Sequence, residues 1–150
     1  RLPNPLLAEA LQARQLDAFQ RCRGFDQEVH LGKSRVDFRL ATPKGPLWIE
    51  AKSVTLVEHG VALFPDAPTA RGTRHLHELV TAVGEGGQAA VVFVIQRPDA
   101  QRFRPHDKAD PAFGEALRLA ASSSVDIYAW TCQVSTEAIV IAERVPITLT

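Results

Sequence analysis

The chain has 150 residues, of which 45% are hydrophobic, and its 17 Lys and Arg residues balance 17 Asp and Glu residues. These values suit one globular domain with a sizeable core, and they exclude a strongly basic protein that attracts nucleic acid through its overall charge. No apolar run in the sequence reaches the roughly 20 residues that a membrane-spanning helix needs. The start of the chain lacks the apolar core of a signal peptide, and Cys22 and Cys132 have no metal-ligand spacing. We therefore expect reduced thiols and a cytoplasmic location.

Helix and strand patterns alternate along the chain. Helical spacing of apolar residues is found at about 5–21, 69–83 and 111–122. Strand patterns are found at 25–30, around Asp37 and Glu50, and at 89–95, 125–132 and 138–142. Asn4 is a candidate N-cap for the first helix, and residues 64–68 are expected to be irregular. Helices between buried strands predict a three-layer α/β/α sandwich around one central mixed sheet.

A predicted hairpin brings two acids and a lysine together. If Leu40 pairs with Leu47, then Asp37 lies directly opposite Glu50. Alternation places Lys52 on the face of Glu50. It also places three apolar residues on the face opposite to Asp37, namely Val36, Phe38 and Leu40. Carboxylates opposed at about 5 Å repel each other, so we expect a divalent cation such as Mg²⁺ between them.

An Asp followed by Glu-X-Lys has the form of a PD-(D/E)XK nuclease core, although the same pattern also arises by chance on a solvated strand. In that chemistry Asp37 and Glu50 bind the metal, and the carbonyl of Ala51 completes the site. Lys52 then orients or deprotonates the attacking water and offsets charge in the transition state. Glu28 is open to two interpretations: it supplies a third carboxylate or holds a second metal through water, or it is an ordinary surface residue.

Basic and polar residues elsewhere are candidate contacts to nucleic acid. They are Arg35, Arg71, Arg74, His75, Gln96 and Arg97. Arg71, His75 and Glu78 follow i, i+4, i+7 spacing and are predicted to share a polar helix face, either to hold phosphate or as a solvated face with an Arg–Glu pair. Gln96 and Arg97 end a buried strand, where α/β sheets present ligands; a strand-capping role is the alternative.

Several segments, taken in order, resemble the sugar fermentation stimulation protein A family. These segments are residues 32–38, 50–56, 64–76, 93–97, 103–105 and 110–113. The resemblance implies a restriction-endonuclease-like domain of the PD-(D/E)XK class that binds or cuts nucleic acid. It also implies a small OB-like barrel before this domain, for which the 150 residues have no counterpart.

We therefore predict one nuclease-like domain over residues 1–150 that uses Mg²⁺ or Mn²⁺ to hydrolyse DNA or RNA, with DNA as the expected partner. Two alternatives stay open. One is a nucleic-acid-binding regulatory protein with the same fold and metal site but no useful turnover. The other is an interaction module whose acids are incidental.

Overall fold

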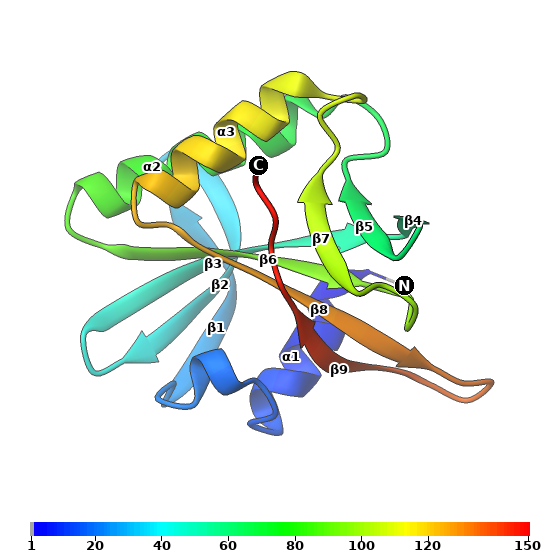
Figure 1. Ribbon diagram of the computed structural model, residues 1–150. Helices are drawn as coiled ribbons and strands as arrows, with labels where there is room; N and C mark the ends of the chain where they lie inside the picture. Colours follow the sequence, from blue (N-terminus) through cyan, green and yellow to red (C-terminus); the bar gives the residue numbers. More distant parts are fainter. Residues whose placement is uncertain (1) are drawn as a thin grey trace.

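A six-stranded mixed sheet forms the centre of the structure, a computed structural model that describes residues 2–150 (Figure 1). Its strands are β1 (Gly24–Leu31), β2 (Ser34–Thr42), β3 (Gly45–Val54), β6 (Gln88–Ile95), β8 (Asp126–Val134) and β9 (Ile139–Val145). They lie in the order β1-β2-β3-β6-β8-β9. The inner strands β3, β6 and β8 are parallel, and the outer neighbours pair antiparallel. The central mixed sheet predicted from the sequence is confirmed.

Helices cover both faces of this sheet (Figure 1). On one face, α1 (Pro3–Gln12) packs through Leu6 and Leu7 into the cluster that contains Val92 and Val94. On the other face, α2 (Ala70–Gly84) and α3 (Pro111–Ser122) pack over the alternate residues of β6. The uninterrupted apolar run of β6 follows from this arrangement, because a strand covered on both faces has no solvent-facing side.

The starts of α2 and α3 are fixed by side-chain caps and by each other. The hydroxyl of Thr69 accepts a hydrogen bond from the N–H of Gly72 at 3.0 Å, and the carboxylate of Asp110 accepts one from the N–H of Phe113 at 3.1 Å. Asp110 also accepts the N–H of Thr69 at 2.8 Å. Both helices were predicted within one residue of their observed bounds, because the helical spacing of apolar residues is a local signal.

The N-terminal helix is shorter than predicted. It begins at Pro3, so Asn4 lies inside the first turn and is not the N-cap. Proline is tolerated there because the first N–H groups of a helix have no intrahelical partner. The helix ends at Gln12 instead of near residue 21, since Arg14 adopts a left-handed φ of 53°. A short 3-10 turn, η1 (Asp17–Phe19), follows.

A second sheet was not predicted. It contains β4 (Leu56–Glu58), β5 (Val61–Phe64) and β7 (Arg102–Pro105), in the order β4-β5-β7. The sequence indicated one sheet only. These strands are short, and β5 finds its parallel partner about 40 residues later, where Val61 pairs with Arg102. A local pattern cannot report such a pairing.

Two further expectations concern the state of the cysteines and the absence of a membrane-spanning helix. Cys22 and Cys132 are free thiols, as predicted. Over residues 2–150, no helix combines the length and apolar character needed to cross a membrane.

Candidate functional site

The hairpin of β2 and β3 has the predicted register, because Leu40 pairs with Leu47. Its ladder ends one pair before Asp37 and Glu50, which occupy the next positions on the two strands. The two acids therefore sit at an opening in the main-chain pairing, and the prediction of a regular cross-strand pair is corrected in this respect.

Strand β2 changes faces at Asp37. Phe38 packs with α1 on one face of the sheet, whereas Val36 packs with the residues of α2 and α3 on the other. The predicted alternation, with both on one side, is wrong here. On the neighbouring strand β1, Glu28 lies opposite Asp37, between the pairs Gln27–Phe38 and Val29–Val36. Glu28 has a left-handed φ of 51°, a conformation that non-glycine residues seldom adopt. Both strands thus depart from regular β geometry beside Asp37.

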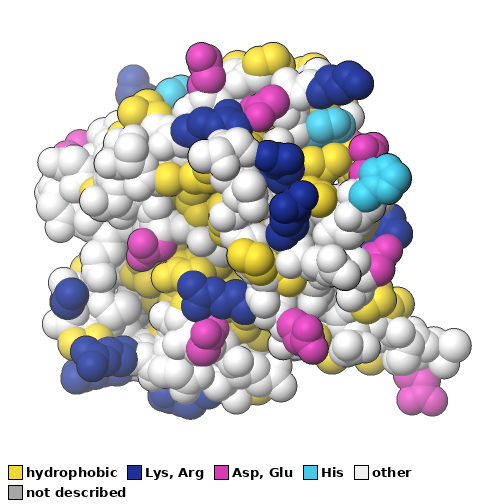
Figure 2. Space-filling model, in the orientation of Figure 1, with side chains coloured by type: hydrophobic (Ala, Val, Ile, Leu, Met, Phe, Trp, Pro, Cys, Tyr) yellow, Lys and Arg dark blue, Asp and Glu magenta, His cyan; other side chains and the backbone are white. Residues whose placement is uncertain are grey.

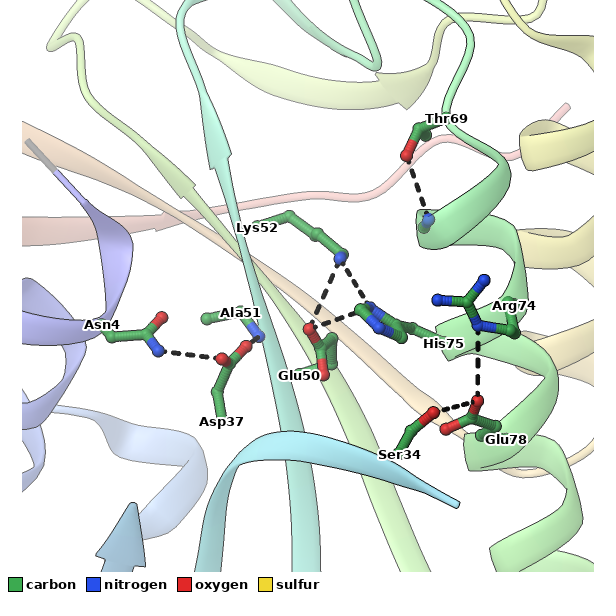
Figure 3. Close-up of polar contacts among 11 residues, drawn as sticks. Asn4, Ser34, Asp37, Glu50, Ala51, Lys52, Thr69, Arg74, His75 and Glu78 are labelled. Atoms are coloured by element: carbon green, nitrogen blue, oxygen red, sulfur yellow. Dashed lines mark hydrogen bonds and ion pairs between the residues drawn. The ribbon is translucent and has the colours of Figure 1, made fainter. Parts of the chain in front are cut away.

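Both oxygens of Asp37 accept a hydrogen bond (Figure 3). The N–H of Ala51 donates to Oδ2 at 2.7 Å. The side chain of Asp37 thus takes the place of a backbone acceptor on β2. The side-chain amide of Asn4, from the first turn of α1, donates to Oδ1 at 2.8 Å. Asp37 is therefore held from two elements. No sequence signal pointed to Asn4, because the contact joins residues 33 positions apart.

Glu50 is buried, and only one of its two carboxylate oxygens has partners among the described residues. Its side chain is 5% exposed, and Oε1 lies 3.4 Å from Nζ of Lys52 and 3.2 Å from Nδ1 of His75. Oε2 is buried and has no hydrogen-bond partner among the described residues. Burial, and next the charge of Asp37, raise the pKa of Glu50 from 4.5 to about 8, against a smaller opposite effect of Lys52. Such a carboxyl group favours binding a proton or a cation.

His75 reaches the same site from α2. The sequence predicted a polar face shared with Arg71, but His75 is 7% exposed and its Nδ1 lies 3.1 Å from Nζ of Lys52 (Figure 3). Its spacing of four from Leu79, which is also buried, was the signal for this inward direction. Burial, and next the charge of Lys52, lower the pKa of His75. The neutral Nδ1 either accepts from Lys52 or donates to Glu50, according to the tautomer.

The donor set fits a hard divalent cation. Asp37 and Glu50 offer carboxylate oxygens, and the unpartnered Oε2 of Glu50 is an oxygen that a cation would satisfy. The carbonyl of Ala51 points to the same edge of β3 as its N–H, toward Asp37, because both groups of a strand residue face one neighbour. Within residues 2–150, no three His, Cys, Asp or Glu side chains converge as a metal site. Glu28 is exposed, and its role as a third carboxylate stays a prediction. Mg²⁺, which commonly keeps several waters, suits a site with two carboxylates.

The predicted nucleic-acid contacts lie in three places. Arg35 is exposed on β2, and Arg71 and Arg74 are exposed on α2. Nε of Arg74 lies 3.8 Å from Glu78, whose carboxylate also accepts a 2.6 Å hydrogen bond from Ser34. The Arg–Glu pair on this helix is thus formed by Arg74, whereas Arg71, the arginine predicted to share a face with Glu78, has no ion pair with any described residue.

Gln96 and Arg97 follow β6 and are engaged within the domain. Nε2 of Gln96 donates to the hydroxyl of Ser53 at 2.7 Å, and Arg97 forms an ion pair with Asp99 at 2.7 Å. On the face that carries α3 and β7, Lys and Arg side chains are interspersed with Asp and Glu (Figure 2). That face offers no continuous basic surface, and contact of any of these residues with nucleic acid stays a prediction.

Comparison with known proteins gives the family. Residues 1–138 match the model of the sugar fermentation stimulation protein RE domain. The chain belongs to the sugar fermentation stimulation protein family. The resemblance carried by the sequence motifs is thereby confirmed.

Curated relatives share the family name. A sugar fermentation stimulation protein homolog of Moorella thermoacetica is 50% identical over 135 residues, which are 89% of this chain and 58% of the relative. Homologs of Desulforamulus reducens and Chloroflexus aggregans are 44% and 47% identical, over 99% and 97% of this chain and 62% and 56% of theirs. The chain thus spans less than two thirds of the length of these relatives.

A solved relative has the same fold. SfsA of Pyrococcus furiosus, in complex with Ca²⁺, superimposes with a TM-score of 0.88 at 30% sequence identity. The match covers 93% of this chain and 61% of the Pyrococcus protein.

Proposed function

We propose that this chain is a restriction-endonuclease-like domain of the PD-(D/E)XK class, a metal-dependent nuclease that hydrolyses phosphodiester bonds in nucleic acid, with DNA as the first substrate to test. The observation that carries the proposal is the buried Glu50, with its unpartnered oxygen, beside Asp37 and Lys52. The Ca²⁺ complex of the Pyrococcus relative supports a divalent cation as the ligand of this fold. For turnover we propose Mg²⁺ or Mn²⁺.

The side chains divide the chemistry between them. Asp37, Glu50 and the carbonyl of Ala51 would hold the cation. When bound, the cation polarises the scissile phosphate and makes a water molecule more acidic. Lys52 donates a hydrogen bond to the attacking water and offsets the negative charge of the transition state, a role that suits a compact ammonium group.

His75 acts on the lysine. In the tautomer that carries its proton on Nε2, His75 accepts one N–H of Lys52 at Nδ1, 3.1 Å away, which fixes the direction of the ammonium group. An ammonium group has three donors; a second one points to Oε1 of Glu50 at 3.4 Å, so one remains for the reacting groups. Burial of His75 lowers its pKa, which favours the neutral imidazole that this acceptor role requires.

A second candidate function is a nucleic-acid-binding regulatory protein with the same fold that does not turn over substrate. It is favoured by the small ligand set, since the described residues contain no converging group of three ligating side chains. The family name refers only to stimulation of sugar fermentation.

The two functions are separated by a cleavage panel. Labelled single-stranded and duplex DNA and RNA are incubated with the chain and with Mg²⁺, Mn²⁺ or EDTA. We expect multiple turnovers that need metal and that disappear in Glu50→Ala, but persist in Glu137→Ala, an exposed glutamate between β8 and β9. Binding without turnover in every arm would favour the regulatory protein. Calorimetry that finds no divalent binding at all would favour an interaction module with incidental acids.

A further inference from the structure

Asn4 connects the N-terminal helix to the acidic site. Its Nδ2 donates a hydrogen bond of 2.8 Å to Oδ1 of Asp37 (Figure 3). Asn is a common helix-capping residue, yet Asn4 lies inside α1, and the N-cap is Leu2, which makes no side-chain capping bond. The amide of Asn4 therefore serves a contact between two elements and not the start of its own helix.

The two donors to Asp37 leave room for a cation. Oδ1 is held by Asn4 and Oδ2 by the N–H of Ala51, so the plane of the carboxylate is fixed. A carboxylate has about four lone-pair sites on its two oxygens, and each oxygen keeps one for a metal. The amide is neutral, so it neither competes with a cation, as Lys or Arg would, nor adds a third negative charge beside Glu50.

The helix that carries Asn4 is anchored independently of the site. Leu6 and Leu7 are 1% and 0% exposed and pack against the sheet with Val92 and Val94. Docking of α1 thus determines where the amide lies. We infer that Asn4 is a positioning residue that orients Asp37 for the divalent cation. This inference rests on the metal site proposed above. Hydrogen-bond partners of metal ligands commonly change metal affinity by roughly 10- to 100-fold.

Calorimetric titration of the full chain with Ca²⁺ tests this role. Asn4→Leu has a side chain of similar shape without a donor, and we expect it to lower Ca²⁺ affinity by roughly 10- to 100-fold. Its melting temperature in EDTA should stay well above the temperature of the titration, so that the loss of affinity is measured on folded protein, although the lost hydrogen bond to a charged group lowers stability. Asn4→Gln keeps the amide donor and should retain part of the affinity. Gln12→Ala, at the exposed far end of α1, is the matched control and should bind as the parent does.

Each outcome decides the matter. Parent-like Ca²⁺ affinity in Asn4→Leu would overturn the inference, and equal losses in Asn4→Leu and Asn4→Gln would overturn the role of the hydrogen bond. Should Asn4→Leu fail to fold, Asn4→Ala is a second variant without a donor. Asp37→Ala separates this inference from the proposed function. If Asp37→Ala binds Ca²⁺ like the parent, the metal site itself is wrong; if only Asp37→Ala loses binding, the metal site stands and Asn4 has no part in it.

Discussion

Removing the charge of Glu50 should change how stability depends on pH in the metal-free protein. Glu50 is 4% exposed, and its pKa in the folded protein is about 8, against an ordinary value of 4.5. Between these values the folded state keeps the proton that the unfolded state has lost. The contribution of Glu50 to stability is therefore fully present below pH 4.5 and is lost as pH rises through 8.

The expected size of this loss follows from linkage. Each pH unit in the window costs about 1.4 kcal/mol, so the whole window amounts to on the order of 3 to 5 kcal/mol. The side chain of Glu50→Gln cannot ionise, so the variant does not lose stability in this way as the pH rises. The difference in unfolding free energy between variant and parent should therefore grow in favour of Glu50→Gln from pH 5 to pH 9.

Urea unfolding in EDTA at each pH measures this difference. Glu137→Gln, at an exposed turn, should follow the parent at every pH. Added Mg²⁺ should stabilise the parent most at high pH, because a metal ligand must be deprotonated, and should have no such effect on Glu50→Gln. A parent–variant difference that stays constant from pH 5 to pH 9 would refute the reasoning from burial.

Three other predictions, made with four variants, test neighbouring parts of the account. His75→Ala should lower the cleavage rate while Ca²⁺ affinity, measured by calorimetry, changes little, since His75 contacts Lys52 and is not expected to bind metal; a large loss of affinity would contradict this. In fluorescence anisotropy, Arg71→Ala should reduce the salt slope of duplex DNA binding by about 0.9, the value of one phosphate contact. Arg97→Ala should change the slope less, because Arg97 already has an acidic partner. Equal slopes in the parent and both variants would argue against a contact of Arg71 with DNA. Glu28→Gln should bind Ca²⁺ like the parent, and a clear loss would restore Glu28 as a third carboxylate.

The acidic site was largely predictable because its core is local. Asp37, Glu50 and Lys52 lie on two strands joined by a short turn, so alternation and one register brought them together. The break in alternation at Asp37 was not predictable, since it depends on the opening between strands and on the left-handed backbone of Glu28. Regular periodicity describes strands only where the ladder continues.

Contacts between distant elements account for the rest of what the sequence did not reveal. Asn4 reaches Asp37 from α1, and the capping preference of Asn suggested a different role. The inward direction of His75 was readable from its spacing with Leu79, but its polarity favoured the solvent-facing side. In both cases a polar residue is satisfied by a tertiary partner that no local pattern reports.

The most direct test of the central claim is the rate of DNA cleavage as a function of Mn²⁺ concentration, measured for the parent and for Asp37→Ala, Glu50→Ala and Lys52→Ala. We predict saturable, metal-dependent turnover in the parent and none in the three variants. The cation and Lys52 both act on the reacting phosphate in the proposed chemistry, so loss of either should suffice. Cleavage by Glu50→Ala with the metal dependence of the parent would contradict the account, because the chemistry would then lie outside this cluster.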